Sequence, residues 1–359
     1  MKILAVNPGS TSTKIALFGD GGEIMRRTLP YDGGELGRYP TVLDQREFRG
    51  AAVRAALGEI AGFSVTDLTA VAGRGGLLRP LPGGVYEVNE RMKADLMAAR
   101  YGSHASNLGA LIADSIARDA GIRAFIVDPV TVDELCPLAR YSGVPEIPRR
   151  SIFHALNQKA TARRAARALG RGYQECALIV AHMGGGTSVG LHVKGRVIDV
   201  NNALDGDGPM SIERAGTVPA GDWMRFTLSH QHDPRGLQAR LTGRGGLVAY
   251  LGVKDFRAIE EAAGAGSGPE GQRCRELVAV LCYQISKSIA ALAAAVEGKV
   301  DAVVLTGGLA FSAIVVEDVR RRVSFLAPVM VFPGENELEA LADGVREALL
   351  GHAEIKCYS

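Results

Sequence analysis

Two stretches of the sequence share one pattern: ILAVNPGSTSTKIALF at 3–18 and LIVAHMGGGTSVGLHV at 178–193. Each begins with a β-rich run, passes through a turn of Gly, Ser and Thr and continues in a second β-rich run, which predicts a hairpin. Such a turn leaves backbone N–H groups uncovered, and these form a concavity that binds anions. A single turn of this kind more often only closes a hairpin. Its repetition at the same spacing favours a function for both copies.

The size and composition of the chain are those of an ordinary globular protein. Its 359 residues correspond to about two domains of roughly 150 residues each. The 41 basic and 39 acidic residues leave a formal net charge of +2, so no broad electrostatic field attracts nucleic acid or anionic lipid. An anionic partner must therefore be bound by local groups.

The sequence predicts a soluble cytoplasmic protein. The start MKILAVNPGS has too few apolar residues for a signal peptide, and nowhere do 18 apolar residues follow one another. The five cysteines are widely spaced, odd in number and never form a C-x-x-C pair, which predicts neither a disulfide framework nor a zinc site. We expect no membrane partner and no nucleic-acid partner.

Strand-like and helix-like segments alternate along the chain, which predicts an α/β protein with partly parallel sheets covered by helices. The expected strands are 3–6, 14–18, 124–127, 177–183, 188–193, 196–200 and 302–306. The expected helices are 89–118, 155–169, 273–298, 311–323 and 336–350. Two prolines and a basic pair at 141–151 predict a domain boundary near residue 150, and hence lobes of 1–150 and 151–359.

Polar side chains stand where expected strands end. Asn7 follows the run 3–6, Asp128 follows 124–127, and His182 lies just before three glycines. Sites in α/β proteins gather at such strand ends. Asp128 is equally consistent with a ligand of hydrated Mg²⁺ and with the start of an Asp-Pro turn.

Two glycine-containing motifs are consistent with phosphate or nucleotide binding. NPGSTSTK (7–14) lacks the second glycine of a P-loop, which leaves a hairpin phosphate site as the alternative. AVVLTGGLAFS (302–312) takes a strand through Gly307 and Gly308 into a helix. Backbone can approach a nucleotide at that junction, or the glycines can simply make the turn.

A third motif, GTSVG (186–190), fits the nucleophile-elbow pattern of serine hydrolases. An elbow requires a strand, a sharp turn and then a helix, whereas Ser188 opens a β-rich run. The sequence therefore disfavours a serine hydrolase.

For several charged residues and histidines, the neighbouring sequence is consistent with more than one role. Glycines around Arg74 and Arg214 leave room for a guanidinium to reach an anion, although a surface ion pair is the commoner role of one arginine. His154 precedes an expected helix, where capping, core packing and catalysis are all open, and His104 is a second such histidine. Glu337 opens the last helix, where a carboxylate favours the helix dipole.

A longer series of motifs, in this order, resembles the acetokinase family and within it the butyrate kinases. The motifs are NPGSTSTK (7–14), GRGGLL (73–78), YEVNE (86–90), HASNLGALIA (104–113), FIVDPVTVDEL (125–135), SIFHALNQKA (151–160), AHMGGGTSVG (181–190), DVNNALDGDGP (199–209), GLVAYLG (246–252), VLTGGLA (304–310) and FPGENELEAL (332–341). They extend over essentially the whole chain.

The resemblance implies a duplicated, ribonuclease-H-like α/β fold with two lobes, of the kind shared by acetate and sugar kinases, heat-shock proteins and actin. It implies an ATP cleft between the lobes and a last helix that packs back on the N-terminal lobe. The implied ATP contacts are Asn7, Ser10, Thr11 and Lys14 in the first hairpin, His182, Gly184, Gly185 and Gly186 in the second, and Gly307 and Gly308 at the adenosine.

The resemblance also implies a reaction, the reversible transfer of a phosphoryl group from ATP to butyrate, which gives butyryl phosphate and ADP. It assigns Arg74 to the carboxylate, Arg214 and His154 to the transferring phosphoryl group, Asp128, Glu337 and Asn7 to Mg²⁺, and Asp128 and His104 to catalysis. The segment around His104 departs slightly from the acetate-kinase spacing.

The sequence indicates the type of reaction more clearly than it indicates which carboxylic acid is the substrate. Gly75 and Gly76 stand where acetate kinases have bulkier apolar residues, which predicts an acyl pocket for a longer chain. One methylene is worth only about 1–3 kcal/mol, so isobutyrate, valerate and propionate remain open. The alternatives are a branched-chain or propionate kinase and a non-catalytic ATP-binding relative. The resemblance further implies a homodimer or a larger homo-oligomer.

Overall fold

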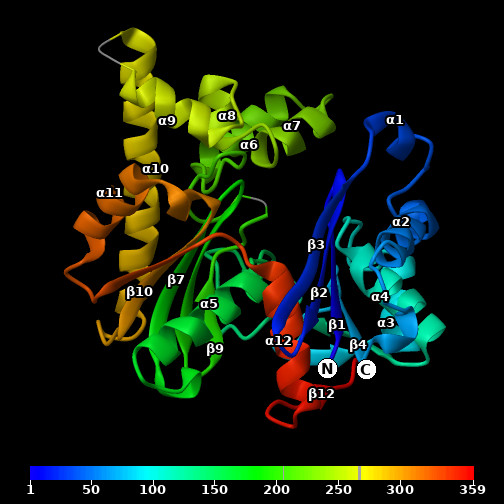
Figure 1. The fold of residues 1–359 in the computed structure, drawn as a ribbon. Helices are drawn as coiled ribbons and strands as arrows, with labels where there is room; N and C mark the ends of the chain where they lie inside the picture. Colours follow the sequence, from blue (N-terminus) through cyan, green and yellow to red (C-terminus); the bar gives the residue numbers. More distant parts are fainter. Residues whose placement is uncertain (205, 266–267) are drawn as a thin grey trace. The chain divides into compact units, whose positions relative to one another are not determined.

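The computed structural model describes residues 1–204, 206–265 and 268–359, and the chain forms two compact units. Unit 1 comprises Met1–Val132 and Asn336–Ser359, and unit 2 comprises Asp133–Glu335. Each unit has one mixed sheet with helices packed against it (Figure 1). The two sheets and their helices confirm the predicted α/β class.

The sheet of unit 1 has seven strands in the order β12-β5-β6-β4-β1-β2-β3. The strands are β1 (Ile3–Pro8), β2 (Ser12–Gly19), β3 (Gly22–Pro30), β4 (Ala70–Arg74), β5 (Val85–Glu87), β6 (Arg123–Val127) and β12 (Ile355–Lys356). The helices are α1 (Gly33–Leu36), α2 (Arg46–Gly58), α3 (Glu90–Met97), α4 (Asn107–Ala120) and α12 (Glu337–Leu349). Strands β1, β4 and β6 are parallel neighbours, so their carboxyl ends lie at one edge.

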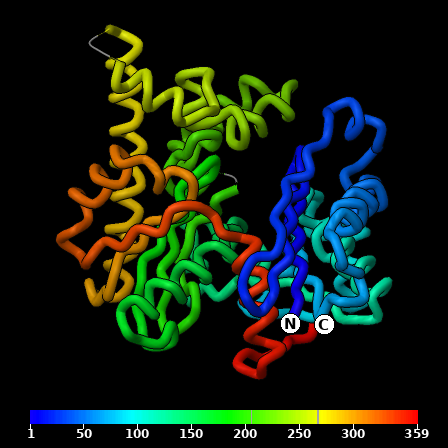
Figure 2. The backbone as a smooth tube through the Cα atoms, viewed as in Figure 1, coloured from blue at the N-terminus to red at the C-terminus, as the bar shows by residue number. Residues whose placement is uncertain are grey.

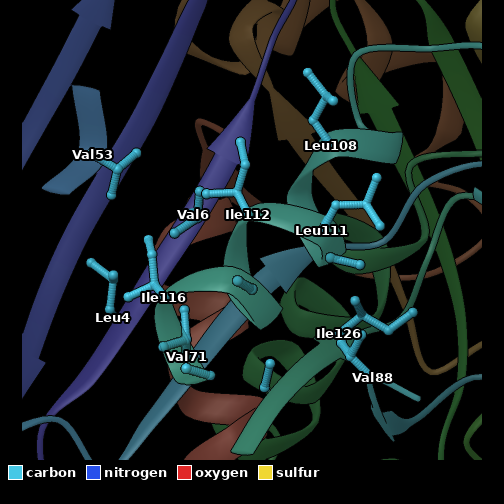
Figure 3. Close-up of a cluster of buried hydrophobic side chains, with 14 of the residues drawn as sticks. Leu4, Val6, Val53, Val71, Val88, Leu108, Leu111, Ile112, Ile116 and Ile126 are labelled. Atoms are coloured by element: carbon cyan, nitrogen blue, oxygen red, sulfur yellow. The ribbon is translucent and has the colours of Figure 1, made fainter. Parts of the chain in front are cut away.

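The alternation of side chains along the strands divides unit 1 into two helical layers. Val6 and Ile126 point to the face covered by α4 and share one apolar cluster with it (Figure 3). Helix α12 contacts β1, β4 and β6, and Figure 2 shows this C-terminal segment running back onto the sheet of unit 1. Gly73 faces α4, so the next residue, Arg74, and likewise Asn7 after Val6, belong to the α12 face.

The sheet of unit 2 has five strands in the order β11-β10-β7-β8-β9. The strands are β7 (Ala177–Met183), β8 (Thr187–Val193), β9 (Arg196–Val200), β10 (Ala302–Gly307) and β11 (Val329–Pro333). The helices are α5 (Ala155–Ala168), α6 (Ala220–Ser229), α7 (Pro234–Leu241), α8 (Gly246–Leu251), α9 (Phe256–Gly264), α10 (Pro269–Ala294) and α11 (Ala313–Val323).

The same alternation assigns the two faces of this sheet. Val180 packs with Ala165 of α5, whereas its neighbour Ala181 packs with Ile285 of α10. His182 is therefore directed to the α5 face. The first turn of α5 stands over this end of β7, as the hydrogen bonds described below show, and it brings polar side chains to the imidazole.

One helix among the described residues, α10, is long and apolar enough to cross a membrane by length and composition. Its buried side chains include Leu281, Cys282, Ile285 and Ile289, which belong to the apolar cluster on the sheet of unit 2. Packing against the sheet thus accounts for its apolar face.

The predicted strands and helices are largely present, with one clear error. The segment 89–118 is not one helix, because α3 ends at Met97 and α4 begins at Asn107. Ala99 and Gly102 between them have φ values of 45° and 118°, which no helix accommodates. Five strands were not predicted either: β3, β4, β5, β11 and β12. The sequences of β4 and β5 carry little β signal because the first contains a glycine and the second has only three residues.

The break between the units lies at Val132 and Asp133, earlier than the expected boundary near residue 150. The reason is that the following segment is bonded into unit 2. The buried Glu134 pairs with Lys159 at 2.9 Å and accepts a hydrogen bond from the N–H of Val197 at 2.7 Å. Residues Asn336–Ser359, which carry α12, belong to unit 1.

Helix α4 approaches strand β4 closely enough that Gly109 has a steric role. A Cβ at Gly109 would clash with the backbone oxygen of Arg74. We expect Gly109→Ala to lower the free energy of unfolding by about 1–3 kcal/mol, although alanine favours a helix interior over glycine. The control is Gly58→Ala at the end of α2, where nothing lies within 4 Å of the added carbon and a gain of up to about 1 kcal/mol is expected. Thermal denaturation measures both, and a Gly109→Ala protein as stable as wild type would contradict the packing argument.

Candidate active site

The carboxyl ends of three parallel strands in unit 1 carry three of the predicted site residues. Asn7 lies near the end of β1, Arg74 ends β4, and Asp128 follows β6 directly. The ladder places Arg74 beside Val127, so Arg74 and Asp128 are near neighbours in this sheet. The expectation that Asn7 and Asp128 stand at strand ends is confirmed, and Arg74 joins them at the end of β4, a strand that the sequence did not predict.

Glu337, at the first position of α12, joins two of these residues. Its Oε2 accepts a hydrogen bond from Asn7 Nδ2 at 2.6 Å and from Arg74 Nη1 at 2.9 Å. Arg74 Nη1 also donates to Asn7 Oδ1 at 3.2 Å, which closes a triangle. Glu337 therefore does more than favour the helix dipole, because it holds a guanidinium and an amide in fixed positions.

The guanidinium of Arg74 has N–H groups that can still bind a ligand. Both of its hydrogen bonds use Nη1, and 22% of its side chain is exposed. Its Nη2 and Nε bond to none of the described residues. Two N–H groups of a guanidinium on one side match the two oxygens of a carboxylate. Arg74 can thus bind a carboxylate while Glu337 compensates part of its charge.

Asp128 has an unusual backbone conformation for a buried carboxylate. Its φ is 38°, a left-handed value, and its side chain is 1% exposed. Its Oδ1 accepts a hydrogen bond from the N–H of Gly84 at 2.7 Å, and its own N–H donates to the oxygen of Gly84 at 3.0 Å. Aspartate tolerates this conformation better than most residues, and the two bonds hold it there.

The oxygen atoms of this cluster suit a magnesium ion. Amide and carboxylate oxygens are its preferred protein ligands, and Mg²⁺ usually binds one or two carboxylates together with water and phosphate. Glu337 Oε1 accepts no hydrogen bond from the described residues, whereas Oε2 accepts two. Over the described ranges, no group of three or more His, Cys, Asp or Glu could hold a metal ion. Asn7 and Glu337 thus offer oxygen ligands to an ion that would take its other ligands from water or phosphate, and Asp128 carries a further carboxylate at the end of strand β6.

His104 lies in the loop before α4 and is exposed. Its Nδ1 accepts a hydrogen bond from the N–H of Ser106 at 3.2 Å, so the ring is bonded to the backbone where α4 begins. This is a local role that the sequence pattern did not specify.

The two glycines after Arg74 do not create open space. A Cβ at Gly75 would lie 2.5 Å from Cβ of Pro129, and a Cβ at Gly76 would lie 2.5 Å from Cα of Asn107. The expectation that they widen an acyl pocket is therefore wrong. They are small because other parts of unit 1 already occupy the volume that a side chain would need.

The hairpin β1–β2 presents its turn as predicted. Ser10 and Thr11 at the tip and Lys14 on β2 are exposed, and Lys14 stands opposite Asn7 in the ladder. The ammonium of Lys14 forms no ion pair within the described parts of the chain. These groups can meet an anion.

Arg49 of α2 holds this turn from behind, and sequence reasoning missed it. Its Nη1 donates to the oxygen of Gly9 at 2.7 Å and its Nη2 to the oxygen of Ser10 at 2.9 Å. Arg49 is 1% exposed, and burial lowers the pKa of its guanidinium below the usual value. The carbonyl oxygens of the turn thus point inward to Arg49. Only its place in the apolar pattern of 46–58 could have indicated its burial.

Two imidazoles in unit 2 stack on each other. The rings of His154 and His182 are 3.8 Å apart between centroids and 10° from parallel. His154 is the N-cap residue of α5 but does not cap the helix with its side chain; its Nδ1 contacts Ser188 Oγ at 2.9 Å. His182 Nδ1 contacts Asn157 Oδ1 at 2.7 Å. Ser188 stands opposite His182 in the β7–β8 ladder, so the pair forms a platform for the ring of His154.

A buried polar chain leads from this platform into unit 2. Gln158 Nε2 donates to Ser188 Oγ at 2.7 Å and to the backbone oxygen of Ser188 at 3.0 Å. Gln158 Oε1 contacts His192 Nε2 at 3.0 Å, and His192 Nδ1 contacts the hydroxyl of Tyr173 at 2.8 Å. Gly190, between Ser188 and His192 on the same face of β8, leaves room for the amide, because a Cβ there would lie 2.5 Å from Gln158 Oε1.

The turn of the second hairpin, Gly184–Gly185–Gly186, lies next to Arg214. A Cβ at Gly186 would clash with the guanidinium of Arg214, so glycine is required for this approach. Arg214 Nη1 also donates to the oxygen of Ala203. The oxygen of Gly185 accepts a hydrogen bond from Ser211 Oγ at 2.6 Å. The structure thus places Arg214 beside the turn Gly184–Gly186. The sequence did not predict this contact.

The two glycines at the end of β10, Gly307 and Gly308, have different roles. Gly307 has a φ of 88°, and a Cβ there would clash with the backbone of Met183, just before the triglycine turn. Gly308 is exposed, and a Cβ there would have nothing within 4 Å. Gly307 is thus a packing residue, whereas Gly308 leaves open backbone.

Comparison with known proteins places this chain in a family. The sequence profile of the acetokinase family matches residues 143–345. A protein named probable butyrate kinase, from Clostridium botulinum, is 48% identical over 357 residues, which cover 99% of each chain. Butyrate kinase 2 of Clostridium acetobutylicum is 46% identical, with the same coverage. The chain belongs to the acetokinase family.

Solved acetokinase structures share the fold. An acetate kinase from Porphyromonas gingivalis matches with a TM-score of 0.73 and 20% identity, over 96% of this chain and 99% of that one. A propionate kinase from Francisella tularensis matches with a TM-score of 0.72 and 18% identity, over 95% and 98%. The chain therefore has the two-lobed α/β fold of these kinases, and its membership of the acetokinase family makes it a phosphotransferase.

The buried Arg49 should contribute strongly to the stability of unit 1. We expect Arg49→Met to lower the free energy of unfolding by about 2–3 kcal/mol, because the oxygens of Gly9 and Ser10 lose their donors. The control is Arg46→Met on the same helix, whose exposed pair with Glu47 is worth less than about 1 kcal/mol. Urea denaturation gives both values, and equal effects of the two substitutions would refute the role of Arg49.

The buried His192 should make unit 2 sensitive to acid. Burial, with Lys159 and Arg163 adding repulsion, lowers the pKa of His192 well below its usual 6.5. The unfolded chain binds this proton below pH 6.5 and the folded chain does not, so stability falls as the pH decreases. We expect a loss from this group of about 1.4 kcal/mol per pH unit below pH 6.5 that is absent in His192→Gln. Urea denaturation between pH 5 and 8 measures it, and parallel pH profiles for the two proteins would be incompatible with a neutral buried His192.

Proposed function

We propose that this protein is a butyrate kinase, which transfers the terminal phosphoryl group of ATP to butyrate and reversibly forms butyryl phosphate and ADP. The observation that carries the proposal is the match with proteins named butyrate kinase, at 46–48% identity over 99% of each chain. A match of that extent includes both units of this chain.

The chemistry requires charge neutralisation more than proton transfer. A carboxylic acid with a pKa of about 4–5 is already ionised at pH 7, so the acceptor needs no general base. The difficulty is that a carboxylate must approach a phosphate in line. Fixed positive groups and N–H donors are the means by which a protein lowers that barrier.

Unit 1 contributes the groups for the acid and for the metal in this proposal. Arg74 binds the carboxylate through the N–H groups that Glu337 and Asn7 leave unused. Asn7, Asp128 and Glu337 hold Mg²⁺, which when bound neutralises phosphate oxygens and orients them. Lys14 is near Asn7 in the ladder and adds positive charge. His104 is a further catalytic candidate, although its described bond is to the start of α4.

Unit 2 contributes the groups for the phosphates. Arg214 beside Gly186, and an N–H of His154, contact the phosphoryl group in transfer. The backbone of Gly184–Gly186 and the side chain of His182 bind the neighbouring phosphates, as Ser10 and Thr11 do from unit 1. Gly308 lines the nucleoside site with its open backbone, and Gly307 brings this turn against Met183. The supporting observations are the exposed Gly185 in the turn, the stacked imidazoles and the nearby guanidinium.

A preference for a four-carbon acid is part of the proposal, and it rests on the relatives and not on Gly75 and Gly76. Pro129 and Asn107 fill the space beside these glycines, so other residues must set the chain length. We also infer that the reaction takes place in the cytoplasm and that the protein is at least a homodimer, which light scattering after size-exclusion chromatography measures.

The direct test is the formation of acyl phosphate, trapped as hydroxamate, from ATP, Mg²⁺ and each of acetate, propionate, butyrate, isobutyrate and valerate. We expect the highest kcat/KM with butyrate. Arg74→Ala and Arg214→Ala should each lower kcat/KM by about 100- to 1,000-fold, because one aimed donor is typically worth roughly 3–4 kcal/mol. The matched control is Arg46→Ala, an exposed arginine that should leave the rate unchanged.

Other outcomes assign other functions. A higher kcat/KM with isobutyrate or propionate would make the protein a kinase for that acid. No hydroxamate with any acid, although ATP raises the melting temperature, would mean a non-catalytic ATP-binding relative. Full activity in Arg74→Ala would remove that residue from the carboxylate site.

A further inference from the structure

Ser188 has a function that its sequence motif did not reveal. It is the serine of GTSVG, but it lies in β8, is fully buried and contacts His154 instead of acting at an elbow. The hydroxyl of Ser188 can donate only one hydrogen bond, although it can accept others. Which of its two neighbours, His154 or Gln158, receives that proton therefore determines the protonation of the imidazole.

The amide of Gln158 settles this question through a backbone carbonyl. The same amide end lies 3.0 Å from the backbone oxygen of Ser188 and 2.7 Å from Ser188 Oγ. A carbonyl oxygen only accepts, so the end of the amide that faces it must be the NH₂ group. Gln158 therefore donates to Ser188 Oγ. The proton of the hydroxyl is left for the other neighbour, His154 Nδ1, at 2.9 Å.

We propose that Ser188, oriented by Gln158, is a positioning residue that holds His154 in the tautomer with its proton on Nε2. Nδ1 accepts from the hydroxyl, so in the neutral ring the N–H must be at Nε2. The inference rests on the proposed function in one respect, since an N–H at Nε2 is what a phosphoryl oxygen requires from His154. The opposite tautomer would present a lone pair to that oxygen.

At the other end of the polar chain, His192 and Tyr173 donate their hydrogen bonds in the same direction, toward His154. Gln158 Oε1 is an acceptor, so His192 Nε2 carries a proton and donates to it. His192 Nδ1 then accepts from the hydroxyl of Tyr173. Each group from Tyr173 to His154 thus donates to the next, and no member has to be charged. Such a chain rigidifies its members because every one is satisfied.

His182 shows that the effect is specific to His154. The amide of Asn157 donates through Nδ2 to the backbone oxygens of Gly334 and Glu335, so its Oδ1 must accept from His182 Nδ1. The neutral His182 therefore carries its proton on Nδ1. Two stacked rings, 3.8 Å apart, are held in opposite tautomers by two amides that backbone carbonyls orient.

The test reads the tautomer directly, by nitrogen-15 NMR of histidine-labelled protein at a pH where the imidazoles are neutral. His154→Gln identifies the signals of His154 among the seven histidines. In wild type we expect an N–H at Nε2 of His154 and a bare Nδ1. In Ser188→Ala we expect a mixture of tautomers. In Gln158→Glu we expect a shift to Nδ1–H, because the carboxylate accepts the hydrogen bond of the hydroxyl, whose oxygen then accepts from His154 Nδ1.

Kinetics should follow the tautomer. We expect Ser188→Ala to lower kcat by about 10- to 100-fold, the usual cost of losing the partner that fixes a histidine tautomer, with little change in KM for ATP. Ser188→Thr keeps the hydroxyl and should restore both the Nε2–H signal and the rate. The matched control is Ser286→Ala, a buried serine of the same unit that bonds within α10 and should change neither.

Two results would overturn the inference: an Nδ1–H signal for His154 in wild type, or an unchanged tautomer and kcat in Ser188→Ala. A failure of the proposed function looks different. If wild type forms no acyl phosphate but the tautomer still responds to Ser188→Ala and Gln158→Glu, the kinase proposal fails and the assignment of the proton stands.

Discussion

One carboxylate oxygen, Oε2 of Glu337, determines how the site in unit 1 is built. It accepts from Asn7 and from Arg74, and it comes from a helix 330 residues further along the chain than Asn7. A guanidinium and an amide at the end of a buried sheet would lose water without compensation if this oxygen were absent. Because Oε2 takes only Nη1 of Arg74, the rest of the guanidinium remains able to bind an anion. The return of α12 to the sheet of unit 1 is thus a condition for the site.

In unit 2 the ordering element is a backbone carbonyl. Amide side chains can be turned by half a revolution with almost no change in shape, so their direction depends on what they face. The oxygen of Ser188 directs Gln158, and the oxygens of Gly334 and Glu335 direct Asn157. The orientation of each amide in turn determines the tautomer of one of the two stacked imidazoles. Charges play no part in this ordering, which is compatible with the low pKa of the buried His192.

The glycines show how sequence reasoning succeeded in one place and failed in another. The turns of the two hairpins were correctly predicted because Gly, Ser and Thr in a turn are a local signal. Gly75 and Gly76 were misread as space, because the atoms that fill it belong to Pro129 and Asn107, distant in sequence. Gly186 and Gly190 make room for Arg214 and Gln158 in the same way. At these four positions glycine marks a close approach, and only the tertiary structure shows which atoms approach.

The sequence by itself determined the α/β class, the two matching hairpins and the polar residues at strand ends. These follow from local properties: the two-residue period of strands, the conformations open to glycine and the position of a residue relative to the end of an apolar run. The tertiary structure alone decided that Glu337 bonds Asn7 and Arg74, that Arg49 holds the first turn, and that Gln158 orients Ser188. Each of these contacts joins a helix to a strand or turn through a side chain whose direction depends on the packing of the whole unit. A one-dimensional pattern contains no information on that packing.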